Sequence, residues 1–201
     1  MRAMRTNPAA SIAACLALLA PAALLAVAAD PAEFGDAVGA VIENAVEAEP
    51  HPSDMPTFTV RPDRVPEVLA FLRTGAPQRF RRLEDLTAID QSARVDRLRL
   101  SAERSGPAPD FTLVYHLLSY DTASRVRVKT EIHGESPVAP SITGLWPSAN
   151  WYEREMWELY GINVKNHGNL KRFLLPDDWN QGNPLRKNWD APDFVRMPEI
   201  E

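Results

Sequence analysis

The chain has 201 residues, 45% hydrophobic and 24% charged, which is enough to form one globular core with extensions. Its formal net charge of −5 gives no basic footprint, so we expect no nucleic-acid partner. Its single cysteine, Cys15, excludes a disulfide framework, a paired-cysteine zinc site and a protein-held iron–sulfur cluster.

The first 30 residues have the pattern of a secretory signal peptide. Arg2 and Arg5 precede an alanine- and leucine-rich stretch that ends in a small-residue cleavage pattern at residues 26–28. Pro21 and the many alanines disfavour a membrane span. The alternative is a mis-assigned start codon, with residues 1–29 absent from the mature chain or disordered.

Hydrophobic periodicity predicts two helices and a short strand in the next segment. The first helix lies within residues 30–50 and ends before Pro50, and its apolar face holds Phe34, Val38, Val41, Ile42, Ala45 and Val46. Residues 56–60 form the short strand. Residues 63–75 form the second helix, with Asp63 as its cap and Gly75 at its end.

The middle of the chain predicts an antiparallel sheet. Residues 78–90 and 94–100 read as strands, and residues 110–120 form a strand that is apolar on both faces and therefore central. A turn at 121–124 leads into residues 125–132, where apolar and charged residues alternate as in a strand with one solvated face. We expect His116 to be a hydrogen-bonded core histidine, and the scattered histidines predict no metal site. The fold class is α+β, with helices covering the sheet.

Residues 151–162, "WYEREMWELYGI", form a helix whose charges and rings do not separate onto two faces. One stripe is apolar, but Glu153 falls between two rings and Trp151 falls between two glutamates. Asn150 and Glu153 predict a capping box, and Gly161 predicts the helix end. Buried charges must be paired, so the sequence raises the question of what covers this helix.

The C-terminal tail is aromatic and rich in proline. We expect that it cannot bury Trp179, Trp189 and Phe194 against itself, and that Arg186 suits bidentate pairing with a partner carboxylate. Two interpretations remain open at this point. The tail folds back onto its own sheet, or it clamps onto a larger subunit.

These C-terminal residues resemble a known family signature. The helix at 151–162, His167, "LKR" at 170–172 and "PLRK" at 184–187 look like the 30 kDa subunit (type C) of respiratory complex I, the proton-pumping NADH:quinone oxidoreductase. The resemblance covers roughly residues 33–201. Its signature and expected interface residues are Trp151, Glu153, Arg154, Glu155, Glu158, Gly161, His167, Leu170, Lys171, Arg172, Trp179, Pro184, Leu185, Arg186 and Lys187.

Several positions depart from the family pattern. Gly168 and Asn169 follow His167 where the family usually has proline and aspartate, and Phe173 replaces an aliphatic residue. Asn183 and Asn188 replace a histidine and an aspartate. These departures leave the branch of the family open, since related subunits occur in membrane-bound hydrogenases and in photosynthetic complex I-like enzymes.

The resemblance implies a subunit of an ion-translocating enzyme that is not catalytic on its own. Such a subunit holds no flavin, cluster or metal, because NADH, FMN, the iron–sulfur clusters and quinone bind to other subunits. It would pack in the peripheral arm, on the cytoplasmic side of the membrane, against the quinone-site subunit (type D) and the cluster-bearing subunit (type B), with membrane contact only through the complex. Glu153 and Arg154 would be buried, with the helix charges paired across or beside a subunit boundary.

The resulting domain division has three parts. Residues 1–29 are an alanine-rich leader, which the resemblance to a cytoplasmic-side subunit indicates is disordered or comes from a mis-assigned start codon. Residues 30–135 are the α+β domain, and residues 136–201 are the signature helix and an extended, irregular subunit-binding tail. An exported α+β binding protein is the alternative if the leader functions as it reads.

Overall fold

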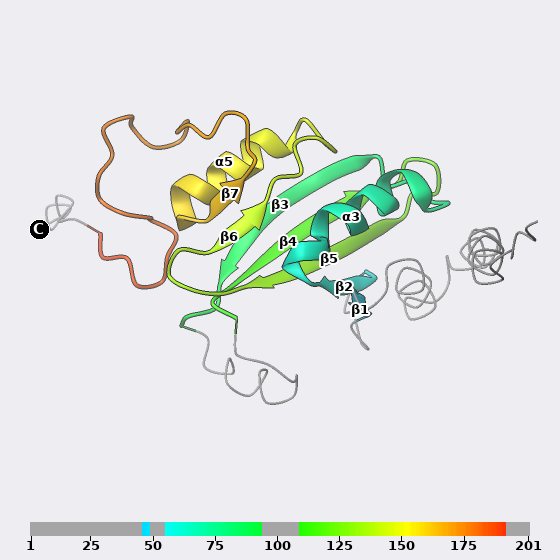
Figure 1. The fold of residues 1–201 in the computed structure, drawn as a ribbon, viewed down its shortest axis with the longest axis horizontal. Coiled ribbons are helices and arrows are strands. Elements are labelled where there is room, and N and C mark those ends of the chain that lie inside the picture. Colours follow the sequence, from blue (N-terminus) through cyan, green and yellow to red (C-terminus); the bar gives the residue numbers. More distant parts are fainter. Residues whose placement is uncertain (1–45, 49–54, 94–108, 192–201) are drawn as a thin grey trace, which may run out of the picture.

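The structure, a computed structural model, describes residues 46–48, 55–93 and 109–191. A five-stranded sheet with the order β1-β2-β5-β4-β3 forms its centre (Figure 1). The strands are β1 (Val46–Ala48), β2 (Thr57–Val60), β3 (Arg82–Asp90), β4 (Phe111–Leu118) and β5 (Arg125–Ile132). The α+β class is therefore confirmed.

The sheet is mixed, whereas the sequence predicts an antiparallel one. The β1–β2, β3–β4 and β4–β5 pairs are antiparallel, but β2 pairs with β5 in parallel. The reason is topological. A helical crossover returns the chain from β2 to the start of β3 at the far edge, and the β4–β5 hairpin then fills the space between them. Strand β5 consequently runs in the same direction as β3 and β2.

The predicted hairpin is confirmed. The β4 strand is central, and buried and partly exposed residues alternate along β5. His116 on β4 accepts a hydrogen bond at Nε2 from Arg127 Nε, 2.9 Å away, and its Nδ1 lies 3.7 Å from an Asp85 carboxylate oxygen. This histidine is satisfied, as expected, and it is only partly buried.

The crossover is helical from Pro62 to Gly75, as the pattern at residues 63–75 predicts. It consists of a 3-10 turn η1 (Pro62–Arg64), the α-helix α3 (Val65–Ala70) and a final π turn η2 (Phe71–Gly75). Asp63 does not cap it, because its carboxylate pairs with Arg61, 2.9 Å away.

The predicted helix within residues 30–50 is wrong at its end, since Val46–Ala48 pairs with β2 as an edge strand. The rest of that helix, the leader at 1–29 and the expected strand at 94–100 lie outside the described residues.

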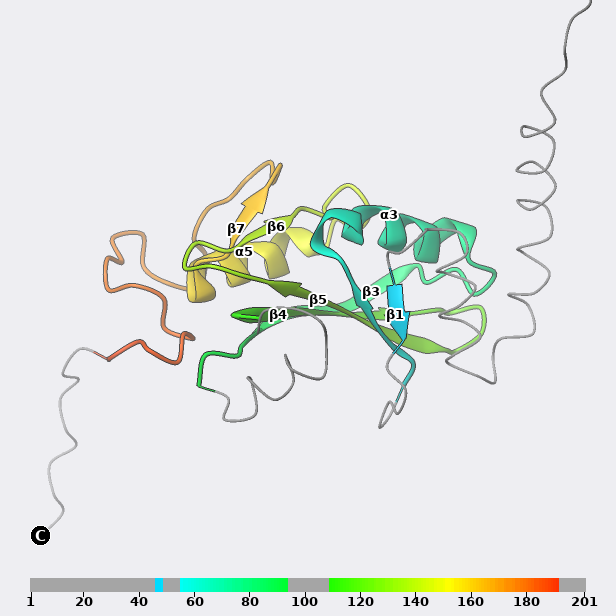
Figure 2. The same cartoon turned by 60° about the horizontal axis from the view of Figure 1, so that its bottom comes forward.

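Helix α5 (Ala149–Tyr160) lies along edge strand β3, on the same side of the sheet as α3 (Figures 1 and 2). Two side chains bind backbone carbonyls of this edge. The Tyr152 hydroxyl donates to the carbonyl of Glu84, at the bulge between Leu83 and Asp85, and the Trp146 indole donates to the carbonyl of Arg81, both at 2.9 Å. An edge strand covered in this way is protected from unwanted pairing.

The segment after residue 135 shares the core of the sheet. The stripe predicted on α5 is confirmed in part, since Met156 is buried in this core and Tyr152 and Tyr160 pack against it. Strands β6 (Val138–Pro140) and β7 (Asn163–Lys165) form a separate parallel pair beside α5. Sheet, α3 and α5 contribute to one apolar cluster that includes Phe58, Leu69, Leu86, Leu113, Tyr115, Val128, Ile142, Trp146, Ala149, Met156 and Ile162.

Within the described parts of the chain, no helix is long and apolar enough to span a bilayer.

Candidate functional site

The two ends of α5 differ from each other in how well the sequence predicts them. The capping box of Asn150 and Glu153 is wrong, because α5 begins at Ala149, no side chain caps it, and Glu153 points elsewhere. The C-terminal end at Gly161 is confirmed, since φ is +70° and the amides of Gly161 and Ile162 bond back to the carbonyls of Trp157 and Met156. This is the left-handed glycine cap that ends many helices.

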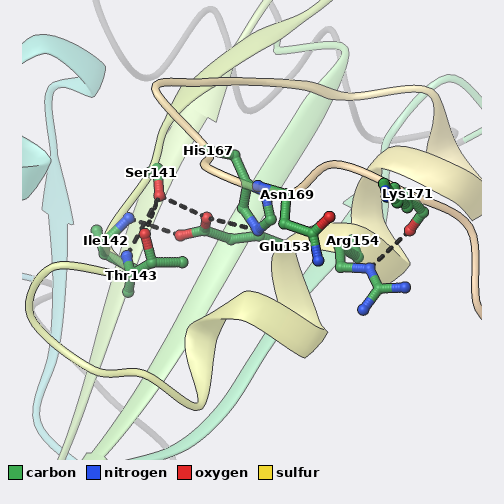
Figure 3. Close-up of polar contacts among 8 residues, drawn as sticks. All are labelled: Ser141, Ile142, Thr143, Glu153, Arg154, His167, Asn169 and Lys171. Atoms are coloured by element: carbon green, nitrogen blue, oxygen red, sulfur yellow. Dashed lines mark hydrogen bonds and ion pairs between the residues drawn. The ribbon is translucent and has the colours of Figure 1, made fainter.

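Glu153 is buried, with 1% of the residue exposed, and its carboxylate binds the loop that follows β6. One oxygen accepts the Ile142 amide at 2.6 Å, and the other accepts the Ser141 hydroxyl at 2.7 Å (Figure 3). Burial raises the pKa of the Glu153 carboxyl, and these two hydrogen bonds partly oppose the rise. Burial also raises the pKa of the Tyr115 hydroxyl on β4, and the charge of Glu153 adds to that rise.

His167 faces Glu153 from the segment after β7. Its side chain is only 1% exposed, and Nε2 lies 3.8 Å from the nearer carboxylate oxygen of Glu153 (Figure 3). The other ring nitrogen, Nδ1, accepts the backbone N–H of Asn169 at 3.1 Å. The sequence placed His167 in the signature without a contact, and the structure brings it to Glu153.

Arg154 points away from Glu153, toward the tail (Figure 3). Its Nε donates to the carbonyl of Lys171 at 2.6 Å, and Nη2 donates to the carbonyl of Arg172 at 2.9 Å. The guanidinium carbon lies 4.9 Å from the ring centroids of both Trp151 and Phe173. Arg154 is 8% exposed, so its expected burial is confirmed, and it is stabilised by two carbonyls and two aromatic faces.

Glu158, one turn after Arg154, binds the next three residues of the same tail segment. Its carboxylate accepts the amides of Phe173, Leu174 and Leu175, with shortest distances of 2.9, 2.8 and 2.7 Å. The residue is 4% exposed. A buried carboxylate that receives three N–H groups is well compensated for the loss of water.

Residues 183–186 cover the C-terminal end of α5. The Asn183 side chain, the Leu185 amide and Arg186 Nε donate to the carbonyls of Glu158, Leu159 and Tyr160, at 3.0, 3.1 and 2.6 Å. These carbonyls have no partner inside the helix, so the tail supplies the donors that a helix end requires.

Gly161 is needed here for space as well as for its backbone angle. A Cβ on this glycine would lie 2.6 Å from Asn183 Oδ1 and 3.0 Å from Arg186 Nη2.

Arg186 uses two of its five N–H donors within the chain. Besides its bond to Tyr160, its Nη2 donates to the carbonyl of Glu135 at 3.0 Å, and its guanidinium lies 5.3 Å from the Phe111 ring centroid. The pairing with a partner carboxylate that we expected from the sequence stays a prediction, since these bonds use Nε and one N–H of Nη2.

Asp90 at the end of β3 anchors the tail beyond Arg186. Its carboxylate accepts the amides of Lys187 and Ser92, both at 2.8 Å. Burial by itself raises the pKa of the Asp90 carboxyl. The hydrogen bonds from Ser92 and Lys187 and the charge of Arg186 together lower the pKa by more than burial raises it, so the pKa is below the usual value.

The tail does not fully bury Trp179 and Trp189, but it brings the two rings together. The Trp179 and Trp189 ring centroids lie 6.3 Å apart, and their indole N–H groups donate to the carbonyls of Gly182 and Gln181. Both residues are thereby half-buried. Phe194 lies outside the described residues.

The remaining signature residues are less buried. Glu155 is half-buried, and burial followed by the charges of Asp85 and Glu158 raises the pKa of its carboxyl. Arg172 donates to the carbonyl of Asp177 and lies near the Trp157 ring. Leu170 and Pro184 are half-buried, whereas Lys171, Leu185 and Lys187 are exposed.

Sequence reasoning assigned no role to several residues that build this site. Ser141 and Ile142 bind Glu153, Asn169 binds His167, Asn183 covers the helix end, and Asp90 anchors Lys187. Asn169 and Asn183 were noticeable only as departures from a family pattern. In the described segments, no group of three or more histidine, cysteine, aspartate or glutamate residues is arranged to hold a metal ion.

Comparison with known proteins identifies the same family over most of the chain. Residues 58–195 match the family described as respiratory-chain NADH dehydrogenase, 30 Kd subunit. The chain is 46% identical over 146 residues to the NADH-quinone oxidoreductase subunit named C/D of Acidiphilium cryptum, covering 73% of this chain and 24% of that protein. It is 44% identical over 148 residues to the protein of the same name from Nitrosospira multiformis, covering 74% and 22%. The chain thus spans about a quarter of the length of these relatives.

Two solved structures share the fold. A trypsin-resistant fragment (1–134) of Nqo5 superposes with a TM-score of 0.52 at 26% identity, covering 62% of this chain and 89% of that one. A chain of the archaeal membrane-bound sulfane sulfur reductase superposes with a TM-score of 0.59, covering 85% and 98%, but at 17% identity this likeness shows the fold alone.

Proposed function

This chain belongs to the family of the 30 kDa subunit of respiratory-chain NADH dehydrogenase, and we propose that it is a non-redox docking subunit of an NADH:quinone oxidoreductase. In this role it sits in the peripheral arm of the complex, on the cytoplasmic side of the membrane. NADH, FMN, the iron–sulfur clusters and quinone bind to other subunits, and ion translocation belongs to the assembly. This chain contributes binding surfaces.

The acidic residues of the signature support a structural role. Glu153 and Glu158 accept hydrogen bonds from the backbone of their own chain. A general acid or base needs a carboxyl within reach of a substrate and a partner that orients it. These carboxyls instead hold the loop after β6 and the tail in place.

The observation that carries the docking proposal is a surface that we call the aromatic–arginine patch, formed by Trp151, Arg154, Phe173 and Leu174. Trp151 is 54% exposed, Phe173 38% and Leu174 52%, although all three are large and apolar. The Trp151 and Phe173 rings meet edge to face with centroids 5.2 Å apart, and Arg154 lies against both.

Tryptophan is among the residues that dominate the binding energy of protein interfaces. The hydrogen bonds that the Arg154 and Glu158 side chains make with the tail backbone hold the patch in one conformation before a partner binds. This lowers the entropic cost of binding.

The proposed partners are the quinone-site subunit and the cluster-bearing subunit. The relatives carry the double name C/D, and this chain matches only about a quarter of their length. Their name supports a portion of type D in the same polypeptide, and a quinone-site unit of that type would be the natural neighbour of this chain.

The experiment is affinity purification of the tagged full-length chain from gently solubilised membranes, with mass spectrometry of every retained protein and of this chain's N-terminus. Quinone-site, iron–sulfur and NADH-binding subunits together would support the proposal. The same core with a nickel hydrogenase subunit would assign the chain to that related complex. Recovery of the chain alone from the periplasm, cut near Ala28, would favour the exported binding protein.

Two variants connect the purification to the patch. Trp151→Ser removes an exposed ring and should leave the fold intact while reducing recovery of the partner subunits by about tenfold or more. Trp151→Phe retains an aromatic ring and should keep most of the recovery. If both variants recovered the partner subunits equally well, the patch would not be part of the interface, and the family assignment would still stand.

A further inference from the structure

His167 is placed so that only one of its neutral forms fits the structure. Its Nδ1 accepts the Asn169 N–H, and a ring nitrogen can accept only when it carries no proton. The proton of the neutral imidazole therefore lies on Nε2. That nitrogen is buried, has no hydrogen-bond partner among the described residues, and lies 3.8 Å from the Glu153 carboxylate (Figure 3).

The contacts of this pair place one charged group, the Glu153 carboxylate, beside His167. Helix α5 provides the Glu153 carboxylate, the loop after β6 provides the Ser141 and Thr143 hydroxyls and the Ile142 amide, and β4 provides the Tyr115 hydroxyl. A positive charge on His167 would face the Glu153 carboxylate, and both side chains are only 1% exposed.

We propose that His167 is a proton-operated latch on the turn at residues 167–169. In the neutral form, Nδ1 holds the Asn169 amide and Nε2–H faces Glu153. When the imidazole takes a proton from solvent at Nδ1, this nitrogen becomes a donor that faces another donor, so the Asn169 hydrogen bond is lost. The imidazolium is at the same time attracted through Nε2–H toward the Glu153 carboxylate. One N–H bond forms, and no other covalent bond changes.

The turn leads directly into the segment that α5 holds. Lys171, two residues after Asn169, is the first residue whose carbonyl Arg154 binds, and Glu158 binds the amides of residues 173–175. Opening of the turn should therefore loosen the start of this segment. If the proposed docking function holds, the same change reaches Phe173 and Leu174 of the aromatic–arginine patch, but the latch itself requires no partner.

The experiment is nuclear magnetic resonance of the full-length chain across a pH series. The imidazole ¹⁵N shifts report which ring nitrogen carries the proton, and amide exchange reports the Asn169 hydrogen bond. We expect the Nε2–H form at alkaline pH. As the imidazole becomes protonated, the Asn169 amide should lose about tenfold in protection, the amount expected for one hydrogen bond.

Two substitutions sharpen the test. In His167→Asn the side-chain oxygen can replace Nδ1 as the acceptor but does not titrate, so Asn169 should stay protected across the series. The matched control His133→Asn changes an exposed histidine after β5 and should keep the wild-type response.

An Nδ1–H form at alkaline pH, or Asn169 protection that stays constant while the imidazole titrates, would overturn the latch. The wild-type tautomer decides this even if His167→Asn does not fold. None of these readouts involves a partner, so the latch and the docking proposal can fail separately.

Discussion

Arg154 and Glu158 lie one turn apart on α5 and bind opposite polar groups of one backbone segment. Arg154 donates hydrogen bonds to the carbonyls of Lys171 and Arg172, and Glu158 accepts hydrogen bonds from the amides of residues 173–175. The charged face of the helix is therefore covered by the tail of its own chain, which answers what covers this helix. Glu153, Arg154 and Glu158 have hydrogen-bond partners within their own chain.

Glu158→Gln tests this cover. Glutamine has one acceptor oxygen, and its NH₂ group would face backbone N–H donors that have lost their acceptor. We expect the free energy of unfolding to fall by about 2 kcal/mol, measured by urea denaturation. Limited proteolysis should show faster cleavage after residue 170. Glu155→Gln, on the same helix and half-buried, is the control, and an equal loss of stability in both variants would contradict the assignment.

Gly161→Ala tests the junction between α5 and residues 183–186. Alanine is disfavoured at a φ of +70°, and its Cβ would overlap Asn183 and Arg186. The backbone strain alone costs about 1 kcal/mol, and displacement of the two side chains adds to it. Gly168→Ala, where a Cβ would meet nothing within 4 Å, is the matched control and should leave the melting temperature nearly unchanged. Similar melting temperatures for both variants would argue against the junction.

Glu153→Gln tests the electrostatic cost of the buried carboxyl. Because burial raises the pKa of Glu153 in the folded state, the favourable contribution of the protonated form is complete below the unfolded-state pKa and is lost as the pH rises through the folded-state pKa. The wild type should lose stability relative to Glu153→Gln as the pH rises from about 4 toward neutrality. The measurement is the difference in unfolding free energy between the two proteins at several pH values. A difference that does not change with pH would show that Glu153 has the same pKa in both states.

Asp90→Asn should show the opposite pH dependence. The pKa of Asp90 is lowered in the folded state, so its contribution is present above the unfolded-state pKa and is lost as the pH falls through the folded-state pKa. The substitution should therefore be more destabilising at neutral pH than in acid. Chemical denaturation of both proteins at about pH 7 and about pH 3 tests this, and an equal loss at both values would contradict it.

Local patterns predicted the elements that rest on short-range rules. The alternation at residues 125–132, the apolar strand at 110–120 and the helix at 151–160 are all present, because a side-chain period of two or 3.6 residues follows from local backbone geometry. Gly161 as the helix end is equally local, since the left-handed backbone angle that ends the helix favours glycine.

The sequence by itself thus determined the fold class and the family. Only the tertiary structure decided what these residues contact. The partners of Glu153, Arg154 and Glu158 are mostly backbone groups of residues 141–142 and 171–175, whose polar atoms are the same in every sequence. A pattern of side chains identifies no particular carbonyl or amide 10 to 20 residues away, so the choice between a capping box and a bound loop, and between a free and a folded tail, depended on how the chain packs.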